Sequence, residues 1–162
     1  MTFRDYFWAS TVLGMHDAIV STVGLVVGLV FADAEQYVIL LTGVIAAVAA
    51  GLSMAASEYL ANRAGGHSDI AIKCGIATGV MYLFTAGMVL MPFLFIKNAY
   101  VAMGFSYLVV VSIIFFFNYV RAHICHEKFW PRFWEMLSIC FVVTVVAFAI
   151  GECAKLCFGI HI

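Results

Sequence analysis

The sequence predicts an all-α integral membrane protein with five transmembrane helices, and two observations support this fold class. Hydrophobic residues make up 65% of the 162 residues and charged residues only 10%, and the mean hydropathy is +1.09, far outside the range of soluble domains. The apolar residues also form runs of helix-spanning length, unlike the roughly ten-residue alternating segments of an outer-membrane barrel. With a formal net charge of −1 and no basic run, we expect no nucleic-acid partner.

Five apolar runs follow one another along the chain, each near or above the roughly 20 residues that a bilayer core requires. The residues before position 12 form an aromatic, interfacial lead-in to the first run, and no small-residue cleavage site of a signal peptide follows that run. We therefore expect a single transmembrane domain over residues 1–162. The approximate limits of the five spans are 12–31, 37–61, 71–96, 99–121 and 134–158.

The distribution of Lys and Arg predicts the orientation, because positive residues gather in cytoplasmic loops. A cytoplasmic N-terminus places six positive residues inside and two outside. The inside set is Arg4, Arg63, Lys73, Arg121, Lys128 and Arg132, and the outside set is Lys97 and Lys155. We therefore expect a cytoplasmic N-terminus and, with five spans, an external C-terminus.

The first span carries an acid inside an apolar run. Asp17 lies within the run 14–29, where membrane-insertion scales put the cost of an aspartate at about 2.5–3.5 kcal/mol. The carboxylate therefore requires a partner, a water-filled cavity or a cation. Gly24 and Gly28 follow at four-residue spacing and clear one helix face for close approach by another helix, either within the chain or across a dimer interface.

The second span also has a face of small side chains, because Gly43 and Gly51 lie on one face among alanines. Its inner half carries Met54 and Glu58, which are one turn apart on a shared face. Reflecting the first two spans about their connecting turn places Met54 within roughly 5 Å of the depth of Asp17. We therefore expect Asp17, Met54 and Glu58 to form a ladder from the inner face into the membrane.

Three stretches resemble the vacuolar iron transporter family. The first span contains Gly-Met-His-Asp-Ala-Ile-Val-Ser-Thr at 14–22, and the second contains Gly-Leu-Ser-Met-Ala-Ala-Ser-Glu-Tyr-Leu at 51–60. Ala-Thr-Gly-Val-Met-Tyr at 77–82, with Met-Pro-Phe at 91–93, is similar to the third span of the family. The last two spans follow in the expected order, so the similarity covers nearly the whole chain.

The resemblance implies a five-span homodimer in a plasma, inner or vacuolar membrane, with a cytoplasmic N-terminus and an external C-terminus. Such proteins move Fe(II), and often Mn(II), out of the cytosol in exchange for protons, along a path between the two subunits. The metal contacts of the family correspond to Asp17, Met54 and Glu58 in this sequence. Because the metal is cargo, we expect no tightly bound cofactor and no enzymatic activity.

The sequence departs from the family pattern in two places. Longer members carry a cytosolic helical metal-binding insert between the second and third spans, whereas here only a short polar stretch separates residues 61 and 71. The chain therefore resembles the short, nodulin-like branch, and we expect no cytosolic metal-binding domain. Ala18 also stands where the family usually has glycine after the acid, which would make the local helix less deformable.

The chemistry of the ladder suits a divalent transition metal. Asp17 and Met54, repeated by a two-fold axis, would supply two carboxylates and two thioethers, a ligand set that fits Fe(II) and disfavours magnesium or calcium. Carboxylates held close together also share protons, which offers a route to proton exchange. Structural alternatives stay open: Asp17 hydrogen-bonded to a hydroxyl such as Ser21, Met54 as helix packing, and Glu58 as a solvated surface acid.

The sequence contains further candidates for secondary metal contacts or proton relays. His16 adjoins Asp17 but points about 100° away around the helix, so the two side chains cannot both face one small site. The connection between the fourth and fifth spans holds His123 and His126 near Cys125 and Glu127, in a spacing that matches no closed zinc pattern and is equally typical of an interfacial loop. The outer end groups Glu152, Cys153, Cys157 and His161, and Asn118 is expected to hydrogen-bond a neighbouring helix.

Two other functions compete with metal transport. A non-transporting membrane assembly or metal-sensing protein would keep the fold, and the missing insert favours it. A membrane redox enzyme would need paired histidines facing each other inside the bilayer for axial haem ligation. His16 is the main histidine within an apolar stretch, so we rank the enzyme last.

Overall fold

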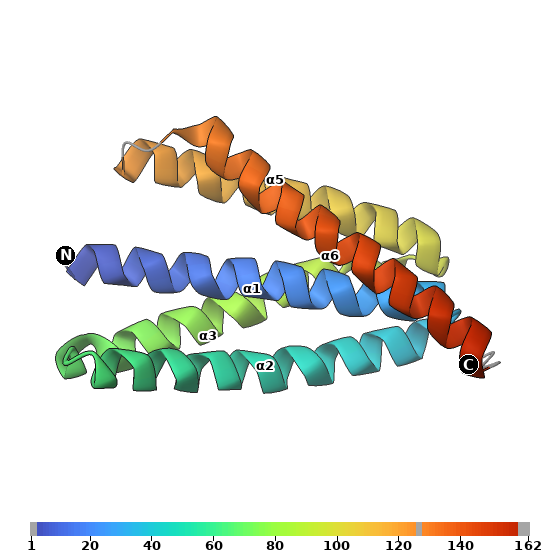
Figure 1. The fold of residues 1–162 in the computed structure, drawn as a ribbon, viewed down its shortest axis with the longest axis horizontal. Coiled ribbons are helices and arrows are strands. Elements are labelled where there is room, and N and C mark those ends of the chain that lie inside the picture. Colours follow the sequence, from blue (N-terminus) through green and yellow to red (C-terminus); the bar gives the residue numbers. More distant parts are fainter. Residues whose placement is uncertain (1–2, 126–127, 159–162) are drawn as a thin grey trace.

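The structure, a computed structural model, describes residues 3–125 and 128–158. Within these ranges every regular element is a helix, which confirms the all-α prediction. Figure 1 shows the helices in chain order: α1 (Phe3–Phe31), α2 (Gln36–Ala64), α3 (Ser68–Leu90), α4 (Pro92–Phe95), α5 (Ala99–Cys125) and α6 (Phe129–Phe158).

Five of the described segments are long and apolar enough to cross a membrane, as predicted. The short α4 extends α3 after a break at Pro92, whose ring cannot continue the helical hydrogen bonding. The spans are Asp5–Phe31, Gln36–Ala64, Ser68–Phe95, Ala99–Ile124 and Phe129–Cys157.

The first and last long helices begin earlier than predicted, at Phe3 instead of residue 12 and at Phe129 instead of residue 134. The apolar runs mark the hydrocarbon core, whereas the helices continue through the interfacial layer, where aromatic and charged residues are tolerated. Pro131 does not interrupt α6, because it lies in the first turn, where backbone N–H groups have no partner within the helix.

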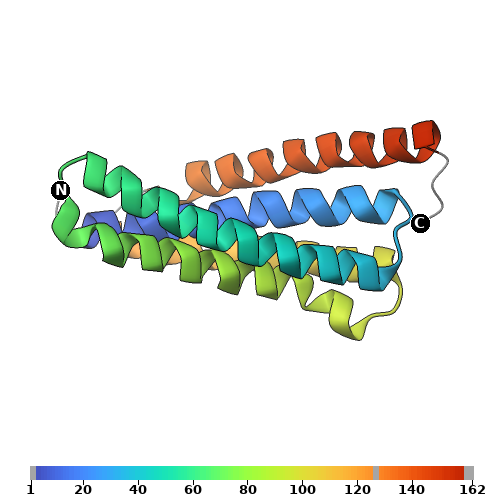
Figure 2. The ribbon, with the colours of Figure 1, turned by 90° about the horizontal axis from the view of Figure 1, so that it is seen from below.

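α1 is the central helix of the bundle. It contacts α2, α3, α5 and α6, and Figures 1 and 2 show it between α6 and the α2–α3 pair. The start of α1 and the end of α6 lie at opposite ends of the molecule (Figure 1). This separation is the arrangement that an odd number of membrane crossings requires.

The tightest packing joins α1, α2 and α3. A Cβ atom on Gly14 of α1 would lie 2.2 Å from the main-chain oxygen of Thr78 on α3, so the two backbones meet directly. On α2, Gly43 packs against Leu90 and Gly51 against Leu83, both from α3. The face of small residues predicted for the second span is therefore covered by α3 of the same chain.

The glycines of the first span face α6. A Cβ atom on Gly24 would lie 3.1 Å from Val143, and one on Gly28 would lie 3.8 Å from the main-chain oxygen of Ala147. Of the two alternatives left open by the sequence, these contacts fit packing within the chain.

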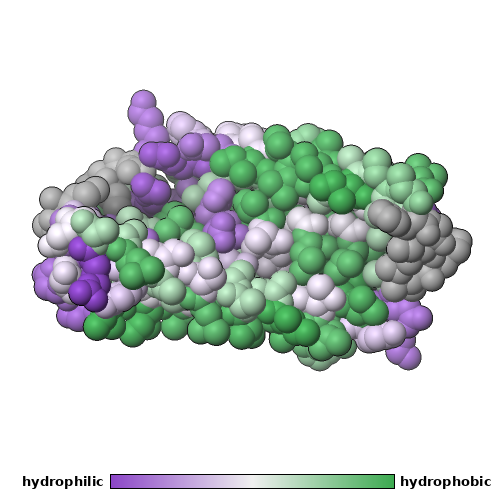
Figure 3. Space-filling model, turned by 60° about the horizontal axis from the view of Figure 1, so that its bottom comes forward, coloured by the Kyte–Doolittle hydropathy of each residue, from purple (hydrophilic) through white to green (hydrophobic). Residues whose placement is uncertain are grey.

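The outer surface is mostly apolar, as expected for a protein surrounded by lipid. On α2 alone, Tyr37, Leu41, Ile45 and Leu52 are each at least 60% exposed. Figure 3 shows an apolar surface, with hydrophilic residues gathered mainly toward the end that holds the start of α1 and one hydrophilic patch reaching into the apolar band.

Candidate metal-transport site

Asp17 lies inside the apolar part of α1. The apolar run begins near residue 12 and the span ends at Phe31, so Asp17 is about 7.5 Å from the start of the run at the helical rise per residue. The side chain is half-buried, and its carboxylate has no hydrogen bond or ion pair with any residue that the structure describes. The acid therefore needs a partner from outside the described chain, whether an ion, water or a second subunit.

The Ser21 hydroxyl does not satisfy this acid. Ser21 Oγ donates to the main-chain oxygen of Asp17 at 2.7 Å and forms a 2.6 Å hydrogen bond with the hydroxyl of Tyr82 on α3. Tyr82 is only 1% exposed. The structure thus places a pair of hydroxyl groups one turn from the acid.

Tyr82 was not among the site residues predicted from the sequence. The signal that would have found it is a mid-span tyrosine, since a buried tyrosine hydroxyl usually finds a hydrogen-bond partner. Its partner, Ser21, comes from a helix far away in sequence, so the pairing itself required the structure.

Met54 packs into the interior shared by α1, α2 and α3. It packs against a buried cluster that contains Ala18, Ala47, Tyr82 and Ala86. Packing alone accounts for this position, so the common depth of Met54 and Asp17 and the role of Met54 as a metal ligand stay predictions.

Glu58 links two helices instead of simply facing solvent. Its Oε1 atom accepts hydrogen bonds from Ser10 of α1 at 2.6 Å and from Asn62 of α2 at 3.1 Å. Ser10 and Asn62 are both buried. Within the described chain, Oε2 receives no hydrogen bond.

Further hydrogen bonds tie α1, α2 and α3 together around Glu58. Thr78 of α3 donates to the main-chain oxygen of Ser10 at 3.0 Å, and the Tyr6 hydroxyl lies 3.0 Å from Nε2 of His67. The inner end of the predicted ladder is therefore held by contacts among three helices.

His16 faces a different side of α1, as its angular offset from Asp17 predicted. It lines a groove of about 340 Å³ between α1, α5 and α6, together with Arg121, Arg132 and Glu135. Its Nε2 atom is buried and has no hydrogen-bond partner in the described structure. His16 therefore does not join Asp17 and Met54 in one site.

Among the described residues, the remaining candidates are not brought together. His123 is exposed at the end of α5 and stacks on Tyr119, while His126, Glu127 and His161 lie outside the described residues. Cys153 and Cys157 are exposed free thiols on α6. In residues 3–125 and 128–158, no group of three or more His, Cys, Asp or Glu side chains could hold a metal.

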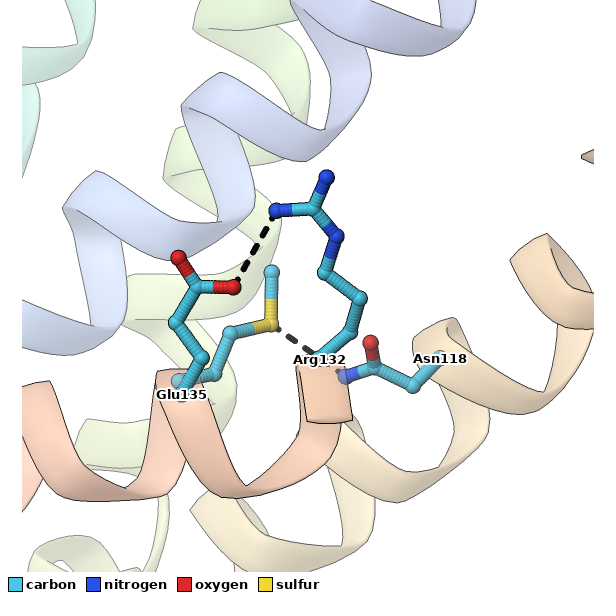
Figure 4. Close-up of polar contacts among 4 residues, drawn as sticks. Asn118, Arg132 and Glu135 are labelled. Atoms are coloured by element: carbon cyan, nitrogen blue, oxygen red, sulfur yellow. Dashed lines mark hydrogen bonds and ion pairs between the residues drawn. The ribbon is translucent and has the colours of Figure 1, made fainter. Parts of the chain in front are cut away.

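Asn118 makes the interhelical contact that the sequence predicted. Its amide donates to Ile114 within α5 at 2.8 Å and contacts the sulfur of Met136 on α6 at 3.2 Å. Figure 4 shows this contact beside the ion pair of Arg132 and Glu135. The role of Asn118 is therefore to join α5 and α6.

These features define the class of the protein as an α-helical, multi-pass membrane protein with an acid inside an apolar span that has no partner among the described residues. The sequence model of the VIT family, the vacuolar iron transporters, matches residues 8–68 and confirms the predicted family resemblance over the first two spans. The resemblance of the later spans stays a prediction. The matched segment contains α2 and most of α1, and with them Asp17, Met54 and Glu58. VIT family members are transporters, which makes metal-ion transport the activity that the family suggests. No curated protein was found to match the chain.

Proposed function

We propose that the protein exports Fe(II), and also Mn(II), from the cytosol in exchange for protons. The observation that carries this proposal is the Asp17 carboxylate, which lies inside the apolar part of a membrane span without a partner in the described chain. An apolar span tolerates such an acid when it serves an ion pathway. The family match adds the transport class.

The path lies between two copies of the chain in this proposal. Leu13 and Ser21 are exposed on either side of Asp17, so this face of α1 is uncovered. Small side chains on one face of α2 are exposed as well and would allow a second copy to approach closely; they are Ala49, Ser53, Ala56 and Ser57. A two-fold axis at this face would add a second Asp17 and Met54 to complete the metal site.

The order of residues suggests a sequence of contacts. Glu58 lies about 6 Å beyond Met54 toward the end that holds the start of α1, at one turn of helix. An ion entering from that end meets Oε2 of Glu58 first, then Met54 and Asp17. Metal arrival at the paired acids displaces protons, and protonation from the other side releases the metal.

Iron flux into proteoliposomes tests the transport activity. Asp17→Asn keeps the size of the side chain but removes its charge, so we expect flux to fall to the level of empty vesicles. Asp69→Asn makes the same change at an exposed position on α3 and should leave flux intact. The proposal is wrong if Asp17→Asn protein, correctly folded, transports iron with unchanged rate and pH dependence.

The same assay addresses the competing function. Residues 65–67 alone connect α2 to α3, and this short connection is the observation that favours a non-transporting assembly or metal-sensing protein. A folded wild-type protein that gives no iron flux above empty vesicles, while still binding the metal, would establish that alternative.

The oligomeric arrangement can be tested on two sides of α2. Ser53→Trp places a large side chain on the proposed dimer face, and we expect it to shift the purified protein from dimer to monomer. Val44→Trp places the same side chain on the opposite side of the helix, about 180° from Ser53, at a residue that is 51% exposed, and should leave the dimer intact. Equal masses for both variants in light scattering would rule out this face as the interface.

A further inference from the structure

The hydroxyl group of Ser21 is held between two helices, one turn beyond Asp17. Its Oγ atom lies 2.7 Å from the main-chain oxygen of Asp17, with a longer contact of 3.4 Å to that of Ala18, and 2.6 Å from the hydroxyl of Tyr82 on α3. For comparison, the exposed Ser112 of α5 bonds to the main-chain oxygen four residues earlier, within its own helix. The bond to Tyr82 therefore fixes the position of the Ser21 oxygen more firmly than the helix alone would.

Donor and acceptor in this pair follow from their chemistry. A main-chain oxygen can only accept, so Ser21, which has one hydroxyl proton, donates that proton to the oxygen of Asp17. Tyr82 is then the donor in its bond to Ser21. The reverse assignment would leave the Tyr82 proton without an acceptor among the described residues, in a side chain that is 1% exposed. The Ser21 oxygen thus accepts one hydrogen bond and keeps its second lone pair free for another contact.

This lone pair belongs to an accessible oxygen beside the acid. The Ser21 side chain is exposed and also borders a groove of about 430 Å³ between α1 and α6. Because Asp17 and Ser21 are four residues apart on one helix, their Cβ atoms are about 5–6 Å apart. Bonds from a divalent transition metal to oxygen are about 2 Å long. One ion can therefore contact the Asp17 carboxylate and the Ser21 hydroxyl together.

A second arrangement of this kind, between α5 and α6, shows what a purely structural bond looks like. Thr144 donates to the main-chain oxygen of Cys140 at 2.8 Å and lies 2.6 Å from the hydroxyl of Tyr107. There the residue one turn earlier is a buried cysteine instead of an acid. Tyr82 and Ser21 also join two helices, but their shared oxygen is exposed and follows a carboxylate that has no partner in the described chain.

We infer that Ser21 supplies a neutral oxygen ligand to the metal site and that Tyr82 is the residue that positions it. The inference rests on the site proposed above, in which a two-fold axis pairs Asp17 and Met54 with their copies. Two Ser21 hydroxyls complete a set of six donors and add oxygen to it, which suits octahedral Mn(II). Tyr82 makes no further hydrogen bond in the described chain, so it orients Ser21 and passes no proton onward.

Exchange of the hydroxyl for a thiol tests the role of Ser21. Ser21→Cys keeps the shape of the side chain but offers soft sulfur in place of oxygen. We expect the purified full-length protein to bind Mn(II) about tenfold more weakly and Cd(II) more tightly, with the ultraviolet absorption of a new cadmium–thiolate bond. Ser112→Cys adds a thiol at an exposed serine of α5 and, as the control, should leave both affinities at the wild-type value.

Two matched tyrosine variants test the positioning role. Tyr82→Phe removes the donor that orients Ser21, and we expect it to weaken Mn(II) binding about tenfold, as the loss of a partner behind a metal ligand does. Tyr107→Phe removes the corresponding bond between α5 and α6 and should leave the Mn(II) affinity unchanged, even if the two variants lose equal stability.

The binding measurements need no transport, so they separate this inference from the proposed export. Equal preference for Mn(II) over Cd(II) in Ser21→Cys and Ser112→Cys would overturn the role of Ser21, and so would a wild type that binds neither metal. Equal Mn(II) affinities of the two tyrosine variants would overturn the role of Tyr82. The expected shift in metal preference without iron flux in proteoliposomes would support the Ser21 ligand and contradict export. Iron flux in the wild type without that shift would contradict the Ser21 ligand alone.

Discussion

The two sides of α1 differ in how closely they are packed. Toward α3 the backbones meet at Gly14 and Thr78, and hydrogen bonds join Ser21 to Tyr82 and Thr78 to the main chain of Ser10. Toward α6 the packing is uneven. A Cβ atom on Gly151 of α6 would lie 2.7 Å from the main-chain oxygen of Gly28, but two grooves interrupt this side, the one with His16 and a more apolar one of about 430 Å³ beside Gly24. The candidate metal residues thus belong to a closely packed unit of α1, α2 and α3, whereas the contact between α1 and α6 is close at Gly28 and interrupted elsewhere.

The largest effect is expected from disrupting the contact between α1 and α3. Gly14→Ala should destabilise the protein by about 3 kcal/mol, because its Cβ atom would overlap the main chain of Thr78 and force α1 from α3. Gly28→Ala makes the same change toward α6, where the nearest atom is 3.8 Å away, and should be neutral or slightly stabilising. Thermal unfolding in detergent compares the two, and equal losses would contradict the contrast between the sides.

A smaller effect should follow from loosening the hydrogen bonds to Glu58. Ser10→Ala removes one of two donors to Oε1, and we expect a loss of about 1–2 kcal/mol because the acceptor is a carboxylate. Thr11→Ala, which removes a hydroxyl bonded only within α1, serves as the control and should cost less than about 0.5 kcal/mol. If Ser10→Ala causes no loss of stability, the hydrogen bond from Ser10 to Glu58 does not stabilise the contact between α1 and α2.

A substitution at Met54 distinguishes a role in packing from a role in ion binding. Met54→Leu conserves volume, so the stability of the α1–α3 unit should change by less than about 1.5 kcal/mol. Iron flux should nevertheless fall, because the thioether is replaced by a hydrocarbon that cannot coordinate a metal. Unchanged flux and unchanged stability together would assign Met54 to packing only.

The smallest effect is expected at the far end of α6, where Lys155 pairs with Asp33. Exposed ion pairs contribute little and are screened by salt. Lys155→Gln should therefore lower the Tm slightly at low ionic strength and leave it unchanged at high ionic strength. A large, salt-independent loss would mean that α6 is fixed as firmly as α3.

The sequence alone predicted the features that depend on local patterns. The five spans follow from run length, whereas the common level of Met54 and Asp17, deduced from one hairpin and the helical rise, stays a prediction. The partners of the glycines did not follow, because they depend on the rotation of each helix about its own axis. The hydrogen bonds of Ser10 to Glu58 and of Ser21 to Tyr82 depend on the same rotations, and so does the groove at His16.

The hydrogen bonding of Glu58 has a consequence for the proposed transport path. Two donors already occupy Oε1, so an ion that followed this path would bind the carboxylate through one oxygen instead of two. Carboxylates bind cations in either mode, and the single-oxygen mode releases its ion more readily. In the proposed path, Glu58 would therefore hold an ion only briefly, whereas longer residence would belong to the Asp17 carboxylates of the two subunits.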